Sequence, residues 1–316
     1  ADRGRDQAYG RDLPPLRGAG PGGRGGLIGA DPLGVRAACA WVVGRAADVR
    51  IGPLERALRA LEGLPVPVWD TGRHYSGPPE RTLRYLVVLD TINFSFWGGG
   101  AGGYYELSAR LAEVFQAGDD LAEEGSLTEV TAGRLRELLG DFPMLEERAE
   151  ALRELGRIGL AGLCRATAAE TAAGLAGRLR SYRDIPAYGG REVPLLKRAQ
   201  ILPADLCAAG VASFPDLDVL TCFPDYKLPQ VLRHLGALEY SQALAQRVDG
   251  RKQLAPGEPA EVEIRAATVV CVERVREALA AAGRPLLSVQ VDWLLWELSQ
   301  EASAMGPHHR VRTIFY

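Results

Sequence analysis

The segment 221–232 crowds an acid, a lysine and two aromatic residues into a turn that two prolines, five positions apart, hold in place. The candidate functional residues there are Phe223, Pro224, Asp225, Tyr226 and Lys227. Two interpretations of this turn are open. Asp225 can cap the helix that begins near Pro229 by accepting backbone N–H groups. Alternatively, it is a carboxylate held beside a stacking surface for a flat ligand, with Lys227 attracting an anion or tuning the acid.

A second cluster, at positions 292–297, combines two acids with two indoles. Its candidate residues are Asp292, Trp293, Trp296 and Glu297. On a helix these four side chains share about half of the surface, because residues three and four positions apart face the same side. The cluster can be a helix cap with core residues. It can also line a pocket for a cationic planar ligand, since indoles stack on such a ligand and carboxylates pair with its charge.

Lysine is rare in this chain. Three of the 37 basic residues are lysines, namely Lys197, Lys227 and Lys252. An ammonium is a compact point charge whose pKa can move, whereas a guanidinium stays protonated. Lys197 and Lys227 lie in unusual segments and are candidate functional cations, with a chance distribution as the alternative.

The composition excludes several classes of protein. The chain has 316 residues, a net charge of -3, 47% hydrophobic residues and 24% charged residues. These values are typical of a soluble globular protein with one large domain or two modest ones. Binding through the nucleic-acid backbone needs clustered positive charge, which this acidic chain lacks overall. A small acidic or phosphorylated ligand stays open.

Metal, disulfide and membrane signals are absent from the sequence. The five cysteines form no Cys-x-x-Cys pair, and the four histidines form no His-Glu-x-x-His motif. We therefore expect no disulfide framework, no zinc ribbon and no metal site. No apolar run approaches about 18 residues, and the N-terminus has no hydrophobic signal core. We expect a cytoplasmic protein without membrane contact.

The chain divides into a tail and a folded region. Residues 1–30 are rich in glycine and arginine and have almost no periodic apolar signal, so we expect a flexible segment there. Residues 31–316 then form the folded domain. The Gly- and Pro-rich stretch 184–193 is the expected seam between helical halves 31–183 and 194–316. The glycine stretch 98–103 is expected to be a mobile turn, because no predicted strand precedes it.

Apolar periodicity and capping signals predict a mainly α-helical protein with a few short strands. The expected helical segments are 31–43, 54–61, 82–90, 107–115, a helix capped by Ser126 and Glu129, 144–180 with a break at Gly156 or Gly162, 194–207, 228–235, 240–247, 259–282 and 292–304. Two short strands, 285–291 and 311–316, alternate well enough to pair with each other.

Seven short motifs occur in one order along the chain and together resemble a known family. They are Asn93-Phe94-Ser95-Phe96-Trp97, Ser181-Tyr182-Arg183-Asp184, the run 197–202, the run 223–232, His234-Leu235-Gly236-Ala237-Leu238, the run 261–265 and the C-terminal run 310–316. The chain from about residue 31 onward resembles the queuosine salvage proteins, which are queuosine 5′-phosphate N-glycosidases.

The resemblance implies a fold, a reaction and a set of site residues. The implied fold is akin to the helix-hairpin-helix DNA glycosylases, although no glycine-bracketed hairpin is evident at 229–238. The implied reaction is hydrolysis of the N-glycosidic bond of queuosine 5′-phosphate, which frees queuine for tRNA modification. Asp225 is then the catalytic carboxylate. The implied substrate-binding residues are His74, Lys197, Phe223, Pro224, Tyr226, Lys227, Asp292, Trp293, Trp296 and Glu297, and Trp293 departs from the tyrosine of relatives.

The implied chemistry gives these residues roles. Positive charge develops on the ribose, so Asp225 can stabilise it, attack as nucleophile or activate water. A 7-deazaguanine leaving group lacks N7, so a proton must reach another ring heteroatom, with Glu297 or Asp292 as donor if burial raises its pKa. A carboxylate of the 292–297 helix can also pair with the cationic amine of queuine. The 5′-phosphate needs Lys197, Arg198 or Lys227.

No cofactor is required by this chemistry, and a small nucleotide is the expected partner. A different class of function is a non-catalytic module that binds a modified nucleotide or tRNA, and tRNA binding calls for a basic face. A glycosylase for damaged DNA is a third reading, and it needs a wedge residue and duplex contacts. The acidic composition disfavours both nucleic-acid partners, so we expect no DNA partner.

Overall fold

The computed structural model describes residues 30–98, 102–119, 121, 123–300 and 305–316. The expected flexible segment 1–30 lies outside the described residues except for Ala30. The same is true of residues 99–101 in the expected glycine turn and of residues 301–304 at the end of the last expected helix.

Helices dominate the described part of the chain, which confirms the mainly α prediction. The α-helices are α1 (Val35–Val43), α2 (Glu55–Leu61), α3 (Pro79–Thr91), α4 (Tyr104–Ala117), α5 (Ala132–Leu139), α6 (Leu145–Ile158), α7 (Ala168–Arg178), α8 (Lys197–Ala208), α9 (Lys227–His234), α10 (Gln242–Asp249), α11 (Pro259–Ala281) and α12 (Ser288–Gln300). No helix among the described residues combines the length and apolar character that a membrane crossing requires.

Three small sheets join distant parts of the chain. Strand β1 (Val49–Ile51) pairs antiparallel with β4 (Leu238–Tyr240), and β5 (Gln253–Leu254) pairs in parallel with β6 (Arg310–Val311). Strands β2 (Ala187–Tyr188) and β3 (Arg191–Glu192) form a hairpin. Its turn is Gly189-Gly190, where both residues have the positive φ that glycine adopts without strain.

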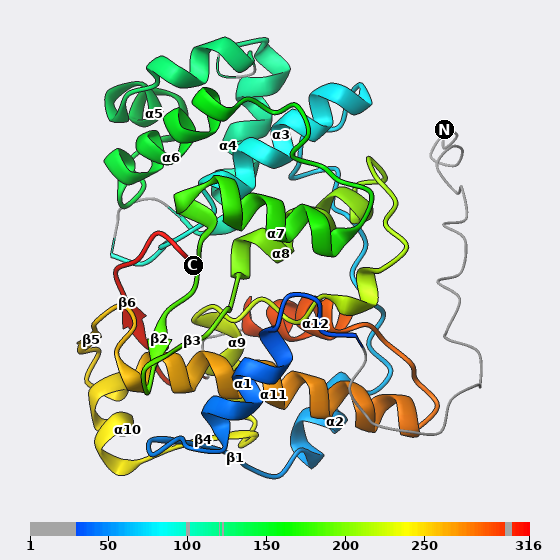
Figure 1. Ribbon diagram of the computed structural model, residues 1–316, viewed down its shortest axis with the longest axis vertical. Helices are drawn as coiled ribbons and strands as arrows, with labels where there is room; N and C mark the ends of the chain where they lie inside the picture. Colours follow the sequence, from blue (N-terminus) through cyan, green and yellow to red (C-terminus); the bar gives the residue numbers. More distant parts are fainter. Residues whose placement is uncertain (1–29, 99–101, 120, 122, 301–304) are drawn as a thin grey trace, which may run out of the picture.

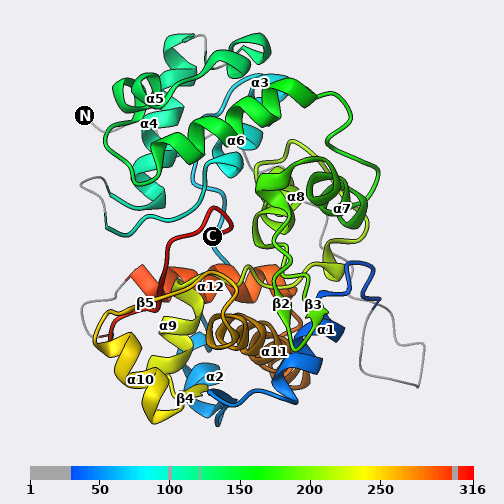
Figure 2. The ribbon, with the colours of Figure 1, turned by 60° about the vertical axis from the view of Figure 1, so that its left-hand side comes forward.

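The helices form two groups, as Figures 1 and 2 show. Helices α3 to α8 make one group, and α1, α2 and α9 to α12 make the other. The C-terminal segment after β6 runs between them (Figure 2). Helices α1 and α2 come first in the sequence but pack on α11. The sequence halves 31–183 and 194–316 therefore do not coincide with the two groups.

Helix α11 is the centre of the second group. It begins at Pro259, a residue whose fixed φ suits the first helical position, and buried residues occur on all sides of it. Helices α1, α9 and α12 pack around it. Three of its buried residues are charged, Glu261, Glu263 and Arg265, and a charge in such a position must be paired or hydrogen-bonded.

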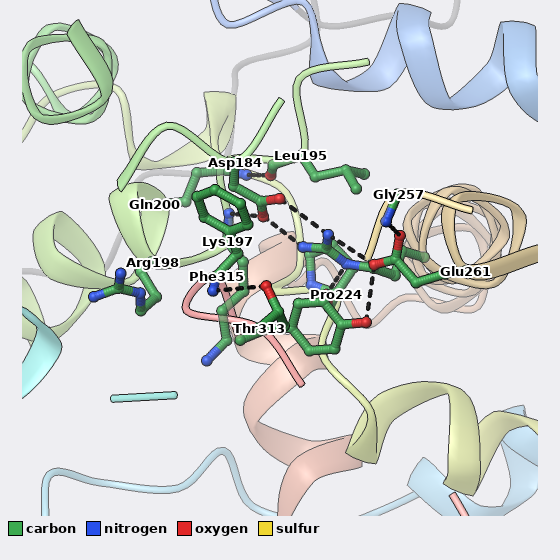
Figure 3. A network of polar contacts seen from close by, with 12 residues as sticks. Asp184, Leu195, Lys197, Arg198, Gln200, Pro224, Gly257, Glu261, Thr313 and Phe315 are labelled. Carbon is green, nitrogen blue, oxygen red and sulfur yellow. Dashed lines mark hydrogen bonds and ion pairs between the residues drawn. The ribbon is translucent and has the colours of Figure 1, made fainter. Parts of the chain in front are cut away.

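The guanidinium of Arg265 joins segments that the sequence keeps far apart. Figure 3 shows Asp184, Pro224 and Glu261, which come together in this network. It forms ion pairs with Asp184 and with Glu261, and its Nε donates to the carbonyl of Pro224 at 2.8 Å. The ring of Tyr316 lies 4.1 Å from the guanidinium carbon, and its hydroxyl donates to Glu261 at 2.8 Å. Burial lowers the pKa of Arg265, but the two carboxylates outweigh burial and raise it above its ordinary value.

Asp184 extends this network to the start of α8. Its carbonyl accepts from the N–H groups of Leu195 and Leu196, and its carboxylate accepts from the N–H of Lys197 at 3.2 Å. The Arg265 network, defined as Arg265, Asp184, Glu261, Pro224 and Tyr316, therefore fixes the start of α8, the turn before α9 and the C-terminus together.

Two local predictions are wrong. The expected cap residue Ser126 lies in a 3₁₀ helix, Glu124–Glu129, and its hydroxyl donates to the carbonyl of Glu123. The next helix, α5, is instead capped by Thr131, whose side-chain oxygen accepts from the N–H of Arg134 at 3.1 Å. The backbone of Val130 is extended, which separates the 3₁₀ helix from α5.

The predicted pair of C-terminal strands is also wrong. Residues 288–291 begin α12, whose first turn is stabilised by Gln290, because its side-chain oxygen accepts from the N–H of Leu287 at 2.9 Å. Alternation misleads here because Val289 and Val291 are both buried on a helix that packs against α9 and α11. Within 311–316 only Val311 belongs to a strand, and it pairs with β5.

We predict that Asp184→Asn lowers the free energy of unfolding by about 3 kcal/mol or more, because it leaves Arg265 a poorly compensated buried charge. The measurement is urea denaturation followed by circular dichroism. Asp141→Asn is the control, since the Asp141–Arg136 pair is exposed and is expected to contribute less than about 1 kcal/mol. Equal small losses in the two variants would show that the Arg265 network does not stabilise the fold.

Candidate functional site

A cavity of about 390 Å³ is lined by residues from both helical groups. Its walls come from the segment 67–74, the loop around Phe96, the starts of α4 and α9, one face of α8, the inner face of α12 and the C-terminal Tyr316. This volume lies in the range of small-molecule binding sites.

Aromatic rings make up much of the cavity wall. They are Trp69, Phe96, Tyr104, Tyr105, Phe223, Tyr226, Trp293, Trp296 and Tyr316. The ring of Trp296 packs edge-on against Tyr105 and Tyr104, with centroids 5.0 and 5.8 Å apart. Rings locked by each other in this way offer rigid surfaces on which a flat ligand can stack.

Asp225 both caps α9 and lines the cavity. Its Oδ1 accepts from the N–H groups of Lys227 at 2.7 Å and Leu228 at 3.0 Å, so the capping interpretation is confirmed. The same side chain lines the cavity and is 8% exposed. Its Oδ2 makes no hydrogen bond to any described residue, so one carboxylate oxygen is left for a ligand.

Lys197 is surrounded by buried carboxyl groups. Burial lowers its pKa, while Asp225, Asp90 and Asp292 raise it. Burial raises the pKa of Asp90 and of Asp292 well above the ordinary value, and raises that of Asp205 to about 7. Burial therefore disfavours the ionised forms of Asp90, Asp205 and Asp292, and the one ammonium nearby offsets part of this effect.

Asp292 connects α12 to the turn that carries Asp225. Its Oδ2 accepts from the N–H of Phe223 at 2.7 Å. This hydrogen bond favours the ionised form, against the burial that raises the pKa. Asp292 therefore has a fixed orientation at the cavity wall, with one oxygen engaged by the protein.

His74 is a neutral hydrogen-bonding group of the cavity wall. Its Nδ1 lies 2.8 Å from the carbonyl oxygen of Asp70, and its Nε2 lies 2.9 Å from the hydroxyl of Tyr104. A carbonyl only accepts, so Nδ1 carries the hydrogen and Nε2 accepts from Tyr104. Burial lowers the pKa of His74, which keeps the ring uncharged.

The edge of the cavity carries exposed charge. Glu297 is exposed and accepts from the hydroxyl of Tyr105 at 2.7 Å. The guanidinium carbon of Arg73 lies 3.8 Å from the centre of the Tyr105 ring. Burial was the condition for a proton-donating role of Glu297, and the structure does not meet it.

The structure brings together all but one of the predicted site residues. Pro224 is not a lining residue, because its carbonyl accepts from Arg265 on the side of the buried network. Arg198, a candidate for the phosphate, does not line the cavity either. Its buried guanidinium donates to the carbonyls of Asp90, Thr91 and Ser181, so it stabilises the junction of α3 and α8 instead.

Sequence reasoning missed several lining residues, of which Asp205 matters most. Asp205 lies on the cavity face of α8 with Lys197 and Ile201. These residues are four positions apart, so the face could have been found from the helical period once Lys197 was a candidate. The aromatic residues Tyr104 and Tyr105 follow the glycine stretch, and no spacing connects them to the other motifs. Among the described residues, no group of three or more His, Cys, Asp or Glu side chains could hold a metal ion.

Comparisons with known proteins point to one family. Residues 73–316 match the sequence profile described as queuosine salvage protein. A protein of Sphaerobacter thermophilus named queuosine 5′-phosphate N-glycosylase/hydrolase is 39% identical over 90% of this chain and 98% of its own length. Proteins with the same name from Dictyostelium discoideum and Bos taurus are 34% and 31% identical, over 75% and 76% of this chain and 79% and 83% of their own lengths.

We predict that Tyr104→Phe raises the pKa of His74 toward its ordinary value, because the variant loses the hydroxyl that stabilises the neutral ring. The measurement is an NMR titration of the His74 ring. Tyr105→Phe is the matched control, since the Tyr105 hydroxyl contacts Glu297 and not His74. A titration of His74 that is unchanged in Tyr104→Phe would contradict the assigned tautomer.

Proposed function

The chain belongs to the queuosine salvage protein family, and on that premise we propose that it hydrolyses the N-glycosidic bond of queuosine 5′-phosphate. The products are the base queuine, which becomes available for tRNA modification, and ribose 5-phosphate. One observation carries the proposal: a buried carboxylate, Asp225, lines an aromatic-walled cavity of nucleotide size.

Asp225 is the proposed catalytic residue. As the bond between base and ribose breaks, its electron pair leaves with the base and positive charge develops on the ribose. A preorganised carboxylate stabilises that charge, and the two N–H groups that hold Oδ1 fix its position before substrate arrives. If Oδ2 instead attacks the anomeric carbon, the carboxylate must also be ionised. Both roles therefore predict that turnover is lost when the charge of Asp225 is removed.

The base is proposed to stack between the cavity's aromatic rings, with carboxylates selecting it. Asp292 is fixed by Phe223 at the cavity wall, where it can accept from N–H groups of the 7-deazaguanine ring. Glu297 stands at the exposed edge, and Tyr105 orients its carboxylate. It is the proposed partner of the cationic amine of queuine, a group that guanine lacks and that distinguishes the two bases.

The 5′-phosphate is proposed to bind at Lys227. Lys227 lines the cavity two residues from Asp225, and its ammonium has no ion pair among the described residues. His308 stacks on Tyr226 with centroids 4.5 Å apart, and Lys227 and Arg310 both disfavour its protonation after burial has lowered its pKa. The charge of Arg310 thus adds to that of Lys227 near His308, behind the cavity wall that Tyr226 forms. Lys197 is less suited to a phosphate, because buried carboxyl groups already surround it.

We also propose kinship to the helix-hairpin-helix DNA glycosylases, a cytoplasmic location and no DNA partner. The mainly helical architecture is compatible with kinship to the helix-hairpin-helix DNA glycosylases. The net charge of -3 supports a small-molecule substrate rather than a DNA partner, and a cytoplasmic location fits salvage of a nucleotide. A non-catalytic nucleotide-binding module is the alternative function, and release of free base distinguishes the two.

We predict that the purified protein releases queuine from queuosine 5′-phosphate without added cofactor, and that Asp225→Asn lowers turnover by about 100-fold or more. Mass spectrometry of the free base measures both. Asparagine keeps an oxygen to cap α9, so folding should persist while the negative charge is lost. Wild-type turnover in Asp225→Asn would reject Asp225 as the catalytic residue. A protein that is stabilised by the nucleotide but releases no base would be a binding module.

We predict that Lys227→Met lowers kcat/KM for queuosine 5′-phosphate by about 10-fold or more, because one charge-assisted contact to the phosphate is lost. The nucleoside queuosine has no phosphate, so its kcat/KM should change by less than about 2-fold. Lys252→Met is the control, because Lys252 is exposed and lies outside the cavity lining. Equal losses on nucleotide and nucleoside would place the phosphate elsewhere.

A further inference from the structure

Asp205 is a buried acid of the cavity wall that has no hydrogen-bond or ion-pair partner among the described residues. It lies two helical turns beyond Lys197 on the cavity face of α8 and is 7% exposed. Its side chain makes no hydrogen bond or ion pair with any described residue. A carboxyl group in such a position is costly unless a ligand or a proton satisfies it.

A second unsatisfied acid interacts with it. Asp90 on α3 is fully buried, and neither of its carboxyl oxygens has a hydrogen-bond partner in the described part of the chain. Burial and the charge of Asp205 raise the pKa of Asp90, while Lys197, Arg198 and the nearby side chain of Asn93 oppose the rise. Two neighbouring carboxyl groups with one ammonium nearby are expected to titrate as a pair and to share one proton near neutral pH.

Few charged groups around Asp205 and Asp90 favour ionisation of both carboxyl groups at once. The titratable groups that influence Asp205 or are influenced by it are Asp90 and Tyr85 of α3, Tyr104 of α4, Lys197 of α8 and Asp292 of α12. Burial raises the pKa of both tyrosines, so they stay neutral. Lys197 is the cation that acts on Asp205, and it also interacts with Asp225 and Asp292. Arg198 of α8 is a second cation that favours the ionised form of Asp90.

We propose that Asp205 is a second catalytic residue, which donates a proton to a ring nitrogen of the departing base, and that Asp90 is a positioning residue behind it. This inference rests on the proposed function. The bond between base and ribose breaks and its electron pair goes to the base, while the carboxyl proton of Asp205 moves to the ring. Water then adds its hydroxyl to the anomeric carbon, and its remaining proton restores Asp205.

The other acids of the cavity are less suited to this step. Glu297 is exposed. Asp292 accepts an N–H of Phe223, which favours its ionised form, and Asp225 accepts two N–H groups. His74 is a neutral acceptor at Nε2. Asp205 alone among these described groups lines the cavity with a carboxyl free of protein hydrogen bonds.

The first test is the pH dependence of turnover in wild type and Asp205→Asn. A proton donor must be protonated, so wild-type kcat should fall as pH rises through about 7. Asp205→Asn should lower kcat by about 100-fold or more, with KM changed by less than about 3-fold, and should abolish this alkaline fall. Asp141→Asn, an exposed acid, should match wild type.

Asp90→Asn tests the pair itself. Removing a neighbouring negative charge makes Asp205 a stronger acid, so the alkaline fall should move to lower pH while turnover survives under mildly acidic conditions. A variant that merely loosens the fold would lower turnover at every pH. Unchanged pH dependence in Asp90→Asn would overturn the shared proton.

The outcomes separate this inference from the proposed function. A wild type that releases no queuine refutes the proposed function, and the proton transfer falls with it. If wild type releases queuine, then full turnover in Asp205→Asn refutes the inference alone. A raised KM at unchanged kcat also refutes it and makes Asp205 a binding carboxylate. The infrared carbonyl bands of protonated carboxyls, in which one band of wild type should be absent from Asp205→Asn while any band of Asp90 or Asp292 persists, check the proton without turnover.

Discussion

The buried ion pairs of Arg265 are the constraint on which the site depends. A guanidinium placed in the core must be surrounded by carboxylates and carbonyls, and here these come from Asp184, Glu261 and Pro224. A misplaced partner would leave a charge uncompensated in a dry interior, so the network tolerates one arrangement of three distant segments. Each segment leads directly into the cavity, through Lys197, Asp225 and Tyr316.

Because the Arg265 network fixes these segments, the cavity can keep several carboxyl groups close to a single ammonium. Four carboxyl groups lie around one ammonium, and burial raises the pKa of Asp90, Asp205 and Asp292. A flexible site would relax by admitting water or separating the acids. Held together, the acids can divide the chemistry, because an ionised group stabilises positive charge on the sugar while a protonated group serves the leaving base. The two roles follow from different surroundings of the same side chain.

Local signals in the sequence predicted much of the architecture and most of the site. Helical periodicity located nearly every helix, and the crowded turn around Asp225 and the acid–indole cluster of α12 both line the cavity. The wrong predictions concern local patterns that are compatible with two different structures. Ser126 had the spacing of a capping box but bonds within a 3₁₀ turn, and the alternating valines before Asp292 are buried on a helix.

The sequence by itself determined which elements form and which residue types each face presents, because these depend on neighbours a few positions apart. Tertiary structure alone decided which faces meet. It turned Pro224 and Arg198 away from the cavity to satisfy buried partners, and it brought Asp90 of α3 close enough to Asp205 of α8 for their charges to interact. No spacing predicts such a pair, since burial and the approach of distant helices create it. Burial also shifts the pKa of these acids, so the residue type alone does not determine whether each acid is protonated.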